Sequence, residues 1–195
     1  MDHISIWKNA LVDGQSLLNS LINNESFIES GAQLSVAMIE CLKNGGTLFT
    51  CGNGGSHTQA MHFAEEWTGR FRKNRKPVAS LALGDSSHVT CVGNDFGFDQ
   101  IFSRQLEALG RKGDMVLLFT TSGQSPNLVE AAKVAKTKGI KCIGILGRDG
   151  GVLKNMVDLA IIVPAQSSDR IQEIHLKILH IAIESTERAL FPENY

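Results

Sequence analysis

Five short apolar runs alternate with segments of helical pattern along most of this chain. A strand that is continuously apolar is buried on both faces, and such strands alternate with helices in parallel sheets that carry helices on both sides. The sequence therefore predicts an α/β fold with a doubly wound, mainly parallel five-stranded sheet. The predicted strands are TLFTC (47–51), VASLAL (78–83), MVLLFT (115–120), CIGILG (142–147) and LAIIVP (159–164).

The two ends of the chain are helical in pattern. Apolar residues recur at helical spacing from Ile4 to about Leu42 with an interruption at 23–24, which predicts a hairpin of two helices. A long helix is expected from about Arg170 to Leu190. We therefore expect helices to lead into the sheet and to close the fold after it.

The length of the chain indicates the number of domains, and its net charge indicates which partners it attracts. A chain of 195 residues suits one domain with one core. We expect a single domain over 1–195, with the helical hairpin in 1–44 and the α/β core and C-terminal helix in 45–195. Nineteen Lys and Arg against twenty Asp and Glu leave a formal net charge of −1, which gives no general attraction to nucleic acid or membranes.

Cysteine usage and hydropathy predict the compartment. The four cysteines form no C-x-x-C pair, so we expect them to be reduced core residues. No apolar run reaches the ~20 residues that a membrane span needs. We expect a cytoplasmic protein that binds small solutes, with no membrane or nucleic acid partner.

Two predicted strand-to-helix loops have the composition of a phosphate site. Ligands bind at such loops because unpaired N–H groups and the positive end of the helix dipole point into the crevice. GNGGS at 52–56 lets the backbone approach a ligand, and TTSGQSP at 120–126 offers four hydroxyl groups. We expect Ser56 and Ser125 to cap the helices that follow. An ordinary capped turn uses the same residue types, but two such loops in one sheet favour phosphate binding.

Ionisable residues follow the first loop at helical spacing. His62 and Glu66 are four residues apart, which places both on one helix face about one turn apart. They can hold one metal ion, or they can simply hydrogen-bond along the helix surface. Glu65 points about 100° away, so we expect a solvated or structural carboxylate.

The C-terminal helix carries a second polar set. Gln172 and His180 lie on one stripe of an otherwise apolar helix, where polar side chains need partners. Eight helical residues span about 12 Å, close to the limit that two side chains and one ion can bridge. Either the helix is broken near Gln172 or the two residues serve a site from different chains. His175 lies off this stripe and is either exposed or buried with its hydrogen bonds made.

Four segments in combination resemble one family over nearly the whole chain. They are CGNGGSHTQAMHFAEEWTGR (51–70), CVGNDFGFDQIFSRQ (91–105), TTSGQSPN (120–127) and DRIQEIHLKILH (169–180). They are similar to phosphoheptose isomerases of the sugar isomerase, or SIS, domain superfamily. The resemblance implies an aldose–ketose isomerase that converts sedoheptulose 7-phosphate to D-glycero-D-manno-heptose 7-phosphate through an enediol. It also implies the first step of ADP-heptose and lipopolysaccharide core synthesis, and a homotetramer. Active sites between subunits are expected if Gln172 and His180 serve one site from different chains.

The resemblance also implies roles for individual residues. The catalytic pair is Glu66 as base and His180 as acid or proton relay. One zinc ion per site would act as a Lewis acid, although a zinc-bound carboxylate is a poorer base, so the two roles of Glu66 compete. The implied zinc ligands are His62, Glu66, Gln172 and His180. The implied substrate contacts are Asn53, Gly54, Gly55, Ser56, Glu66, Asn94, Asp95, Thr120, Thr121, Ser122, Ser125 and Gln172.

Small departures from the family pattern occur beside these positions. Thr120 and Gln124 stand where the family pattern leads us to expect Ser and Asn. Since Thr keeps the hydroxyl group, the change affects only fine geometry. Arg70 and Asp169 match positions that support the site.

Two non-catalytic roles within the superfamily are alternatives. The ending ERALFPENY (187–195) resembles a SIS-domain protein that binds the bacterial replication initiator, and other SIS domains sense sugar phosphates. The replication-initiator group lacks the isomerase pair, which Glu66 and His180 supply here, and no basic DNA-binding segment accompanies the domain. We therefore favour the enzyme.

Overall fold

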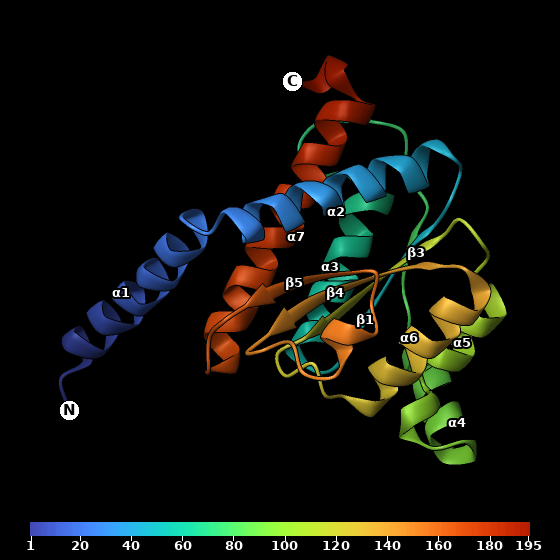
Figure 1. Cartoon of the computed structure of the whole chain (residues 1–195), viewed down its shortest axis with the longest axis horizontal. Coiled ribbons are helices and arrows are strands. Elements are labelled where there is room, and N and C mark those ends of the chain that lie inside the picture. Colours follow the sequence, from blue (N-terminus) through green and yellow to red (C-terminus); the bar gives the residue numbers. More distant parts are fainter.

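The computed structural model describes all residues 1–195, with a five-stranded sheet at its centre (Figure 1). The strands lie in the order β2-β1-β3-β4-β5 and every neighbouring pair is parallel, which confirms the predicted fold class. The second strand is shorter than predicted, because the Val78 N–H donates to the Trp67 carbonyl at 3.0 Å instead. The strands are β1 (Leu48–Gly52), β2 (Ser80–Ala82), β3 (Met115–Thr120), β4 (Lys141–Gly147) and β5 (Leu159–Val163).

The first two helices and the last one begin and end close to the predicted positions. The break between the first two arises because the Asn24 side chain accepts the Phe27 N–H and so starts a new helix. The helices are α1 (His3–Ile22), α2 (Glu25–Lys43), α3 (Gly55–Thr68), α4 (Ser86–Asp95), α5 (Ser103–Leu109), α6 (Pro126–Lys138) and α7 (Ser168–Leu190). Three short 3₁₀ helices are η1 (Phe98–Gln100), η2 (Leu153–Asn155) and η3 (Pro192–Asn194).

The sheet separates two apolar clusters. Along β3, Leu117 and Phe119 pack into the cluster formed with α2, α3 and α7, whereas Val116 and Leu118 pack into the cluster formed with α4, α5 and α6. Successive side chains of a strand point to opposite faces. Covering both faces therefore requires an unbroken apolar run, which this strand has from Met115 to Phe119.

α7 runs unbroken from Ser168 to Leu190 along one face of the sheet. Ile171, Ile174 and Ile178 are buried along it, and their helical spacing keeps one stripe of the helix on the core. The predicted break near Gln172 is therefore wrong.

α1 projects from the body of the protein (Figure 1). Its tie to α7 is a hydrogen bond from Arg170 Nη1 to the Ala10 carbonyl at 2.9 Å. Ile4, Trp7 and Leu11 are 69%, 73% and 69% exposed on this helix. A single chain therefore leaves an apolar surface on α1 uncovered. None of the helices combines the length and the apolarity that crossing a lipid bilayer requires.

The cysteines are unpaired, but one of them is not in the core. Cys41, Cys51 and Cys142 are buried, and burial raises the pKa of Cys41 to about 11 and that of Cys142 to about 12. Cys91 is exposed, contrary to the expectation from sequence. The reason is that α4 buries only Val92 against the sheet.

Candidate active site

α3 and α7 lie side by side on one face of the sheet (Figure 1). Near the start of both helices, Gln59 Nε2 donates to the Gln172 carbonyl at 2.6 Å. Further along both, His62 faces His180. The later residue of α3 contacts the later residue of α7, so the two helices run parallel. Each turn of α3 therefore packs against one particular turn of α7. This packing brings together ionisable residues that are far apart in sequence.

The resulting cluster consists of His62 and Glu66 from α3 and His180 from α7. The two histidine Nε2 atoms are 3.0 Å apart, and Glu66 Oε1 lies 3.4 Å from His62 Nε2 and 3.9 Å from His180 Nε2. The ring of Phe71 packs against His180 at 5.8 Å between centroids. Glu65 is the most exposed of the nearby carboxylates, in agreement with a solvated role. A hydrogen bond between His62 and Glu66 along the surface of α3 does not account for His180, which comes from α7.

The cluster fits a zinc ion. Two imidazole nitrogens and one carboxylate oxygen form a donor set found in catalytic zinc sites. Donor atoms on one tetrahedral zinc lie about 3.3 Å apart at ordinary bond lengths, and the spacings in this cluster are 3.0, 3.4 and 3.9 Å. All three ligand atoms lie within 4.8 Å of one another. His62, Glu66 and His180 therefore form a possible metal-binding group with room for a fourth ligand.

The surroundings shift the proton affinities of the two candidate catalytic groups. Burial raises the pKa of Glu66 above its ordinary value, the charge of Glu65 adds to this, and His62 opposes it. Burial lowers the pKa of His180, and His62 with other nearby cationic groups acts in the same direction. The two pKa values therefore move toward each other. Proton exchange between a carboxylate and an imidazole is easiest when their pKa values are close.

The β1–α3 loop is built on backbone and amide contacts. Gly54 is the N-cap of α3 at φ 55°, with no side-chain cap, and Ser56 is buried inside the first turn. Ser56 therefore does not cap the helix, contrary to expectation, because α3 begins one residue before it. Asn53 exchanges two amide hydrogen bonds with Asn127 of α6, at 2.9 and 2.8 Å. Sequence reasoning missed Asn127, whose only signal is a polar residue in the first turn of a helix.

The β3–α6 loop uses one of its hydroxyls to hold its own shape. Thr120 Oγ1 accepts the N–H groups of Ser122 and Gly123 at 3.3 and 3.2 Å. Ser125 is at the N-cap position before Pro126, as expected, but its hydroxyl makes no cap hydrogen bond. The Leu128 and Val129 N–H groups donate to the Ser125 carbonyl, both at 3.1 Å. Since Pro126 has no N–H, the Ser125 hydroxyl and the Asn127 N–H are the groups at the start of α6 that remain available to a ligand.

The two loops meet at the edge of the sheet where the winding reverses direction. β1 has β2 on one side and β3 on the other, and the loops follow the carboxyl ends of β1 and β3. In open α/β sheets this switch point is where ligands bind. Thr121 lies at the α7 side of the crevice, where its hydroxyl accepts from Ser168 at 3.2 Å. The starts of α3 and α6 therefore lie at the one edge of the sheet where such folds bind anions.

Comparisons with known proteins identify the family. The SIS domain family matches residues 15–147. A phosphoheptose isomerase of Fusobacterium nucleatum is 48% identical over 179 residues, which is 92% of each chain. This chain belongs to the phosphoheptose isomerase family of SIS-domain proteins. A solved phosphoheptose isomerase from Francisella tularensis superposes with a TM-score of 0.91 at 34% identity, covering 96% of this chain and 100% of that chain. One from Neisseria gonorrhoeae gives 0.88 at 35% identity, over 94% and 97%.

Within this phosphoheptose isomerase fold, Gln172 lies apart from the cluster in its own chain. Its side chain sits against the backbone of Gly55 so closely that a Cβ there would come within 2.8 Å of Gln172 Nε2. Gly55 is seven residues before His62, or about 10 Å along α3. Gln172 therefore stands at the level of the phosphate loop, two turns below His180.

Asn94 and Asp95 also lie apart from the other predicted residues of the phosphoheptose isomerase site. Both are at the exposed end of α4, where Asn94 Nδ2 donates to Asp95 Oδ1 at 2.7 Å. In Figure 1, α4 is separated from α7 by the rest of the fold. A cavity of about 550 Å³ borders the first loop instead, lined by His57, Asp85 and Phe102 among others. Within one chain, Asn94 and Asp95 have no hydrogen bond to the loops or to the cluster.

Proposed function

We propose that this chain isomerises sedoheptulose 7-phosphate to D-glycero-D-manno-heptose 7-phosphate. The single observation that carries the proposal is the cluster of His62, Glu66 and His180, which this chain forms on its own. The chain belongs to the phosphoheptose isomerase family, whose reaction such a cluster can catalyse. We place the reaction in the cytoplasm at the start of ADP-heptose supply for lipopolysaccharide. We also propose that 1–195 acts as one SIS domain, since both apolar clusters share one sheet.

Glu66 supplies the base of the proposed reaction. Moving the carbonyl from C2 to C1 requires a proton to leave one carbon and return to the other through an enediol. Oε1 of Glu66 faces the two histidines, while Oε2 has no hydrogen bond or ion pair. One oxygen can therefore serve as a ligand while the other takes the proton. This arrangement reduces the conflict between the two roles of the carboxylate.

His180 handles protons at the sugar oxygens. Its lowered pKa, caused first by burial, keeps the imidazole neutral near neutral pH. A metal-free neutral imidazole can donate one proton and accept another, as a relay between two neighbouring oxygens requires, whereas a ring whose Nε2 holds a metal ion keeps only its Nδ1–H as a donor. The ring is held from one side by Phe71. His180 can therefore shuttle a proton without leaving its place.

The proposed cofactor is one zinc ion held by His62, Glu66 and His180. When bound, it would supply Lewis-acid polarisation of the carbonyl and stabilise negative charge on the oxygens. The fourth ligand in this proposal is Gln172 from a neighbouring chain, because the Gln172 of the same chain lies about two turns away along α7.

The separation of the loops from the cluster supports an extended sugar with its phosphate at the far end. The phosphate edge begins at Gly55, and His62 is about 10 Å further along α3. Asn53, Gly54, Ser56, Thr121, Ser122 and Ser125 lie at or near the crevice and are proposed phosphate and sugar contacts, with Thr120 shaping the loop. Asn94 and Asp95 remain proposed contacts that require a neighbouring chain.

A homotetramer with sites between subunits is the proposed assembly. The apolar surface of α1 is left uncovered by its own chain. A second apolar groove of about 260 Å³ lies between α2 and α7, where Phe27, Ile28, Ile178 and Ile181 line it. Apolar surfaces of this kind are typical of subunit interfaces.

The direct test is turnover of sedoheptulose 7-phosphate by the purified protein, before and after chelation and again after zinc is restored. We expect product with zinc and little product after chelation. Absence of product under every metal condition would refute the isomerase and favour a binding role.

A mixing experiment tests the shared site. Since Glu66 and His180 meet within one chain, the informative pair is Gln172→Ala and Glu66→Ala. Each variant alone should be strongly impaired. If Gln172 serves the neighbouring cluster, mixed oligomers should regain part of the turnover, because some sites then combine an intact Gln172 with an intact Glu66. Mixing two samples of the same variant is the control, and no recovery in the mixed oligomer would show that sites are self-contained.

A further inference from the structure

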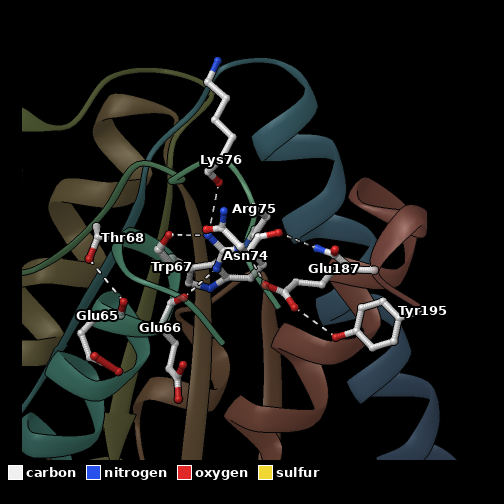
Figure 2. Close-up of polar contacts among 10 residues, drawn as sticks. Glu65, Glu66, Trp67, Thr68, Asn74, Arg75, Lys76, Glu187 and Tyr195 are labelled. Atoms are coloured by element: carbon white, nitrogen blue, oxygen red, sulfur yellow. Dashed lines mark hydrogen bonds and ion pairs between the residues drawn. The ribbon is translucent and has the colours of Figure 1, made fainter. Parts of the chain in front are cut away.

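One buried guanidinium joins the two helices that carry the cluster (Figure 2). Arg75 follows α3, and its side chain is fully buried. Its Nε donates to Glu187 Oε1 of α7 at 2.5 Å. Its Nη1 and Nη2 donate to the carbonyls of Trp67 and Glu66 at 2.8 and 2.6 Å. All three nitrogens are therefore engaged, and they reach both helices at once.

The two carbonyls belong to the last turn of α3, where helix carbonyls have no partner within the helix. The Gly69 N–H satisfies the Glu65 carbonyl, Arg75 satisfies the Glu66 carbonyl, and Arg75 shares the Trp67 carbonyl with the Val78 N–H. A cation at a helix C-terminus is also favoured by the helix dipole. Arg75 is therefore the C-terminal cap of α3, and one of the peptide groups that it holds is that of Glu66 itself.

Glu187, the partner of Arg75, is also buried and fully hydrogen-bonded. Glu187 is 1% exposed, and its second oxygen accepts the Tyr195 hydroxyl at 3.0 Å. The guanidinium lies 5.1 Å from the Trp67 ring and 5.6 Å from the Phe191 ring. The last residues of the chain therefore close over the pair, and Figure 2 shows the Glu66 side chain pointing away from it.

Two polar interactions thus connect α3 and its following segment to α7, one on each side of the cluster along the helix axes. The Gln59–Gln172 hydrogen bond lies on one side and the Arg75–Glu187 pair lies on the other. Glu187 is seven residues after His180, about 10 Å along α7. If one helix slid along the other, the distances between the metal-binding atoms of the cluster would change. These two interactions oppose such a movement.

We propose that Arg75 and Glu187 are positioning residues that set the spacing of Glu66 and His62 against His180. The inference rests on the proposed function of the cluster. Stability alone does not explain the pair, because a buried ion pair is often no more stabilising than apolar side chains of the same volume. The pair acts through the Glu66 peptide and through α7, and it does not contact the substrate.

Cobalt binding tests the positioning role apart from turnover. Co²⁺ alone, titrated into the metal-free protein, reports affinity and ligand geometry through its visible absorption. Arg75→Lys keeps the charge but has no fork to reach two carbonyls and a carboxylate. Glu187→Gln keeps a polar group of the same size, and it serves as the second variant should Arg75→Lys not fold. The matched control is Arg72→Lys, because Arg72 pairs with Glu184 of α7 from the same segment but touches no α3 carbonyl.

We expect both variants to bind Co²⁺ about 10–100-fold more weakly with an altered spectrum, as for loss of outer contacts of a metal site. Their kcat should fall while KM stays within about twofold of the wild type, because the phosphate loops are untouched. The control should match the wild type. A folded variant with a lower unfolding temperature but unchanged Co²⁺ affinity and spectrum would overturn the proposal. Absence of Co²⁺ binding and of turnover in the wild type would instead refute the proposed function as well.

Discussion

His175 should make the stability of this protein depend on pH, and the structure gives the size of the effect. The ring is fully buried against Phe119 at 6.4 Å between centroids, and neither nitrogen has a hydrogen-bond partner. Of the two possibilities left open by the sequence, burial is therefore confirmed, but satisfied hydrogen bonds are not. Burial lowers the pKa of His175 from 6.5 to about 4, with the nearby Leu146 backbone opposing this only in part.

The sign follows from where the proton binds. Between pH 6.5 and about 4 the unfolded chain protonates this histidine and the folded chain does not, so stability is lost as pH falls through that window. At about 1.36 kcal/mol per pH unit, the full window is worth about 3 kcal/mol. Above pH 6.5 the ring is neutral in both states and contributes no pH dependence.

His175→Leu is the perturbation, and urea unfolding followed by circular dichroism is the assay. Metal-free protein at one fixed concentration should be compared at pH 7.5, 6.5, 5.5 and 4.5, since metal and subunit association both alter apparent stability. The loss of unfolding free energy per pH unit should be about 1 kcal/mol smaller in the variant than in the wild type at the lower end of the range. His3→Leu, at an exposed position, should keep the wild-type slope. Equal slopes in wild type and His175→Leu would refute the reasoning.

Two further predictions concern the base and the second loop. Glu66→Gln should lower kcat by about 10²–10⁴-fold in steady-state assays with the fold intact by circular dichroism, because the amide cannot take a proton; retention of more than a tenth of the activity would contradict its role as base. Gly123→Ala should lower the unfolding free energy by at least about 2 kcal/mol, because Gly123 has φ +64° and a Cβ there would lie 2.0 Å from the Gly150 carbonyl oxygen. Gly31→Ala is the matched control, since nothing lies within 4 Å of its Cβ position, and an equal loss in both variants would rule out the close contact as the cause.

Some of the site followed from local periodicity alone. The spacing of His62 and Glu66 put them on one helix face, because four residues make about one turn of any α-helix. The position of Ser125 before Pro126 likewise predicted the start of α6, since proline is favoured in the first turn. The role expected for Ser56 is wrong, because Gly54 at positive φ caps α3 two residues before Ser56.

The residues that needed tertiary structure are those that act across elements. Asn127 pairs with Asn53 from 74 positions away, and Arg75 caps α3 while it pairs with Glu187, 112 positions away. Neither residue stands out by type or spacing in the sequence. Their partners are chosen by how the helices pack on the sheet, which no local pattern records.

The parallel sheet and its coverage on both faces can be predicted from sequence, because the two-residue repeat of a strand and the helical repeat are properties of short segments. β3 was predicted residue for residue at 115–120 for this reason. The packing of α7 on α3 is what joins His180 to His62 and Glu66 and keeps Gln172 about two turns away. An unbroken α7 lying parallel to α3 fixes both outcomes, since a rigid helix cannot bring residues eight positions apart to one point.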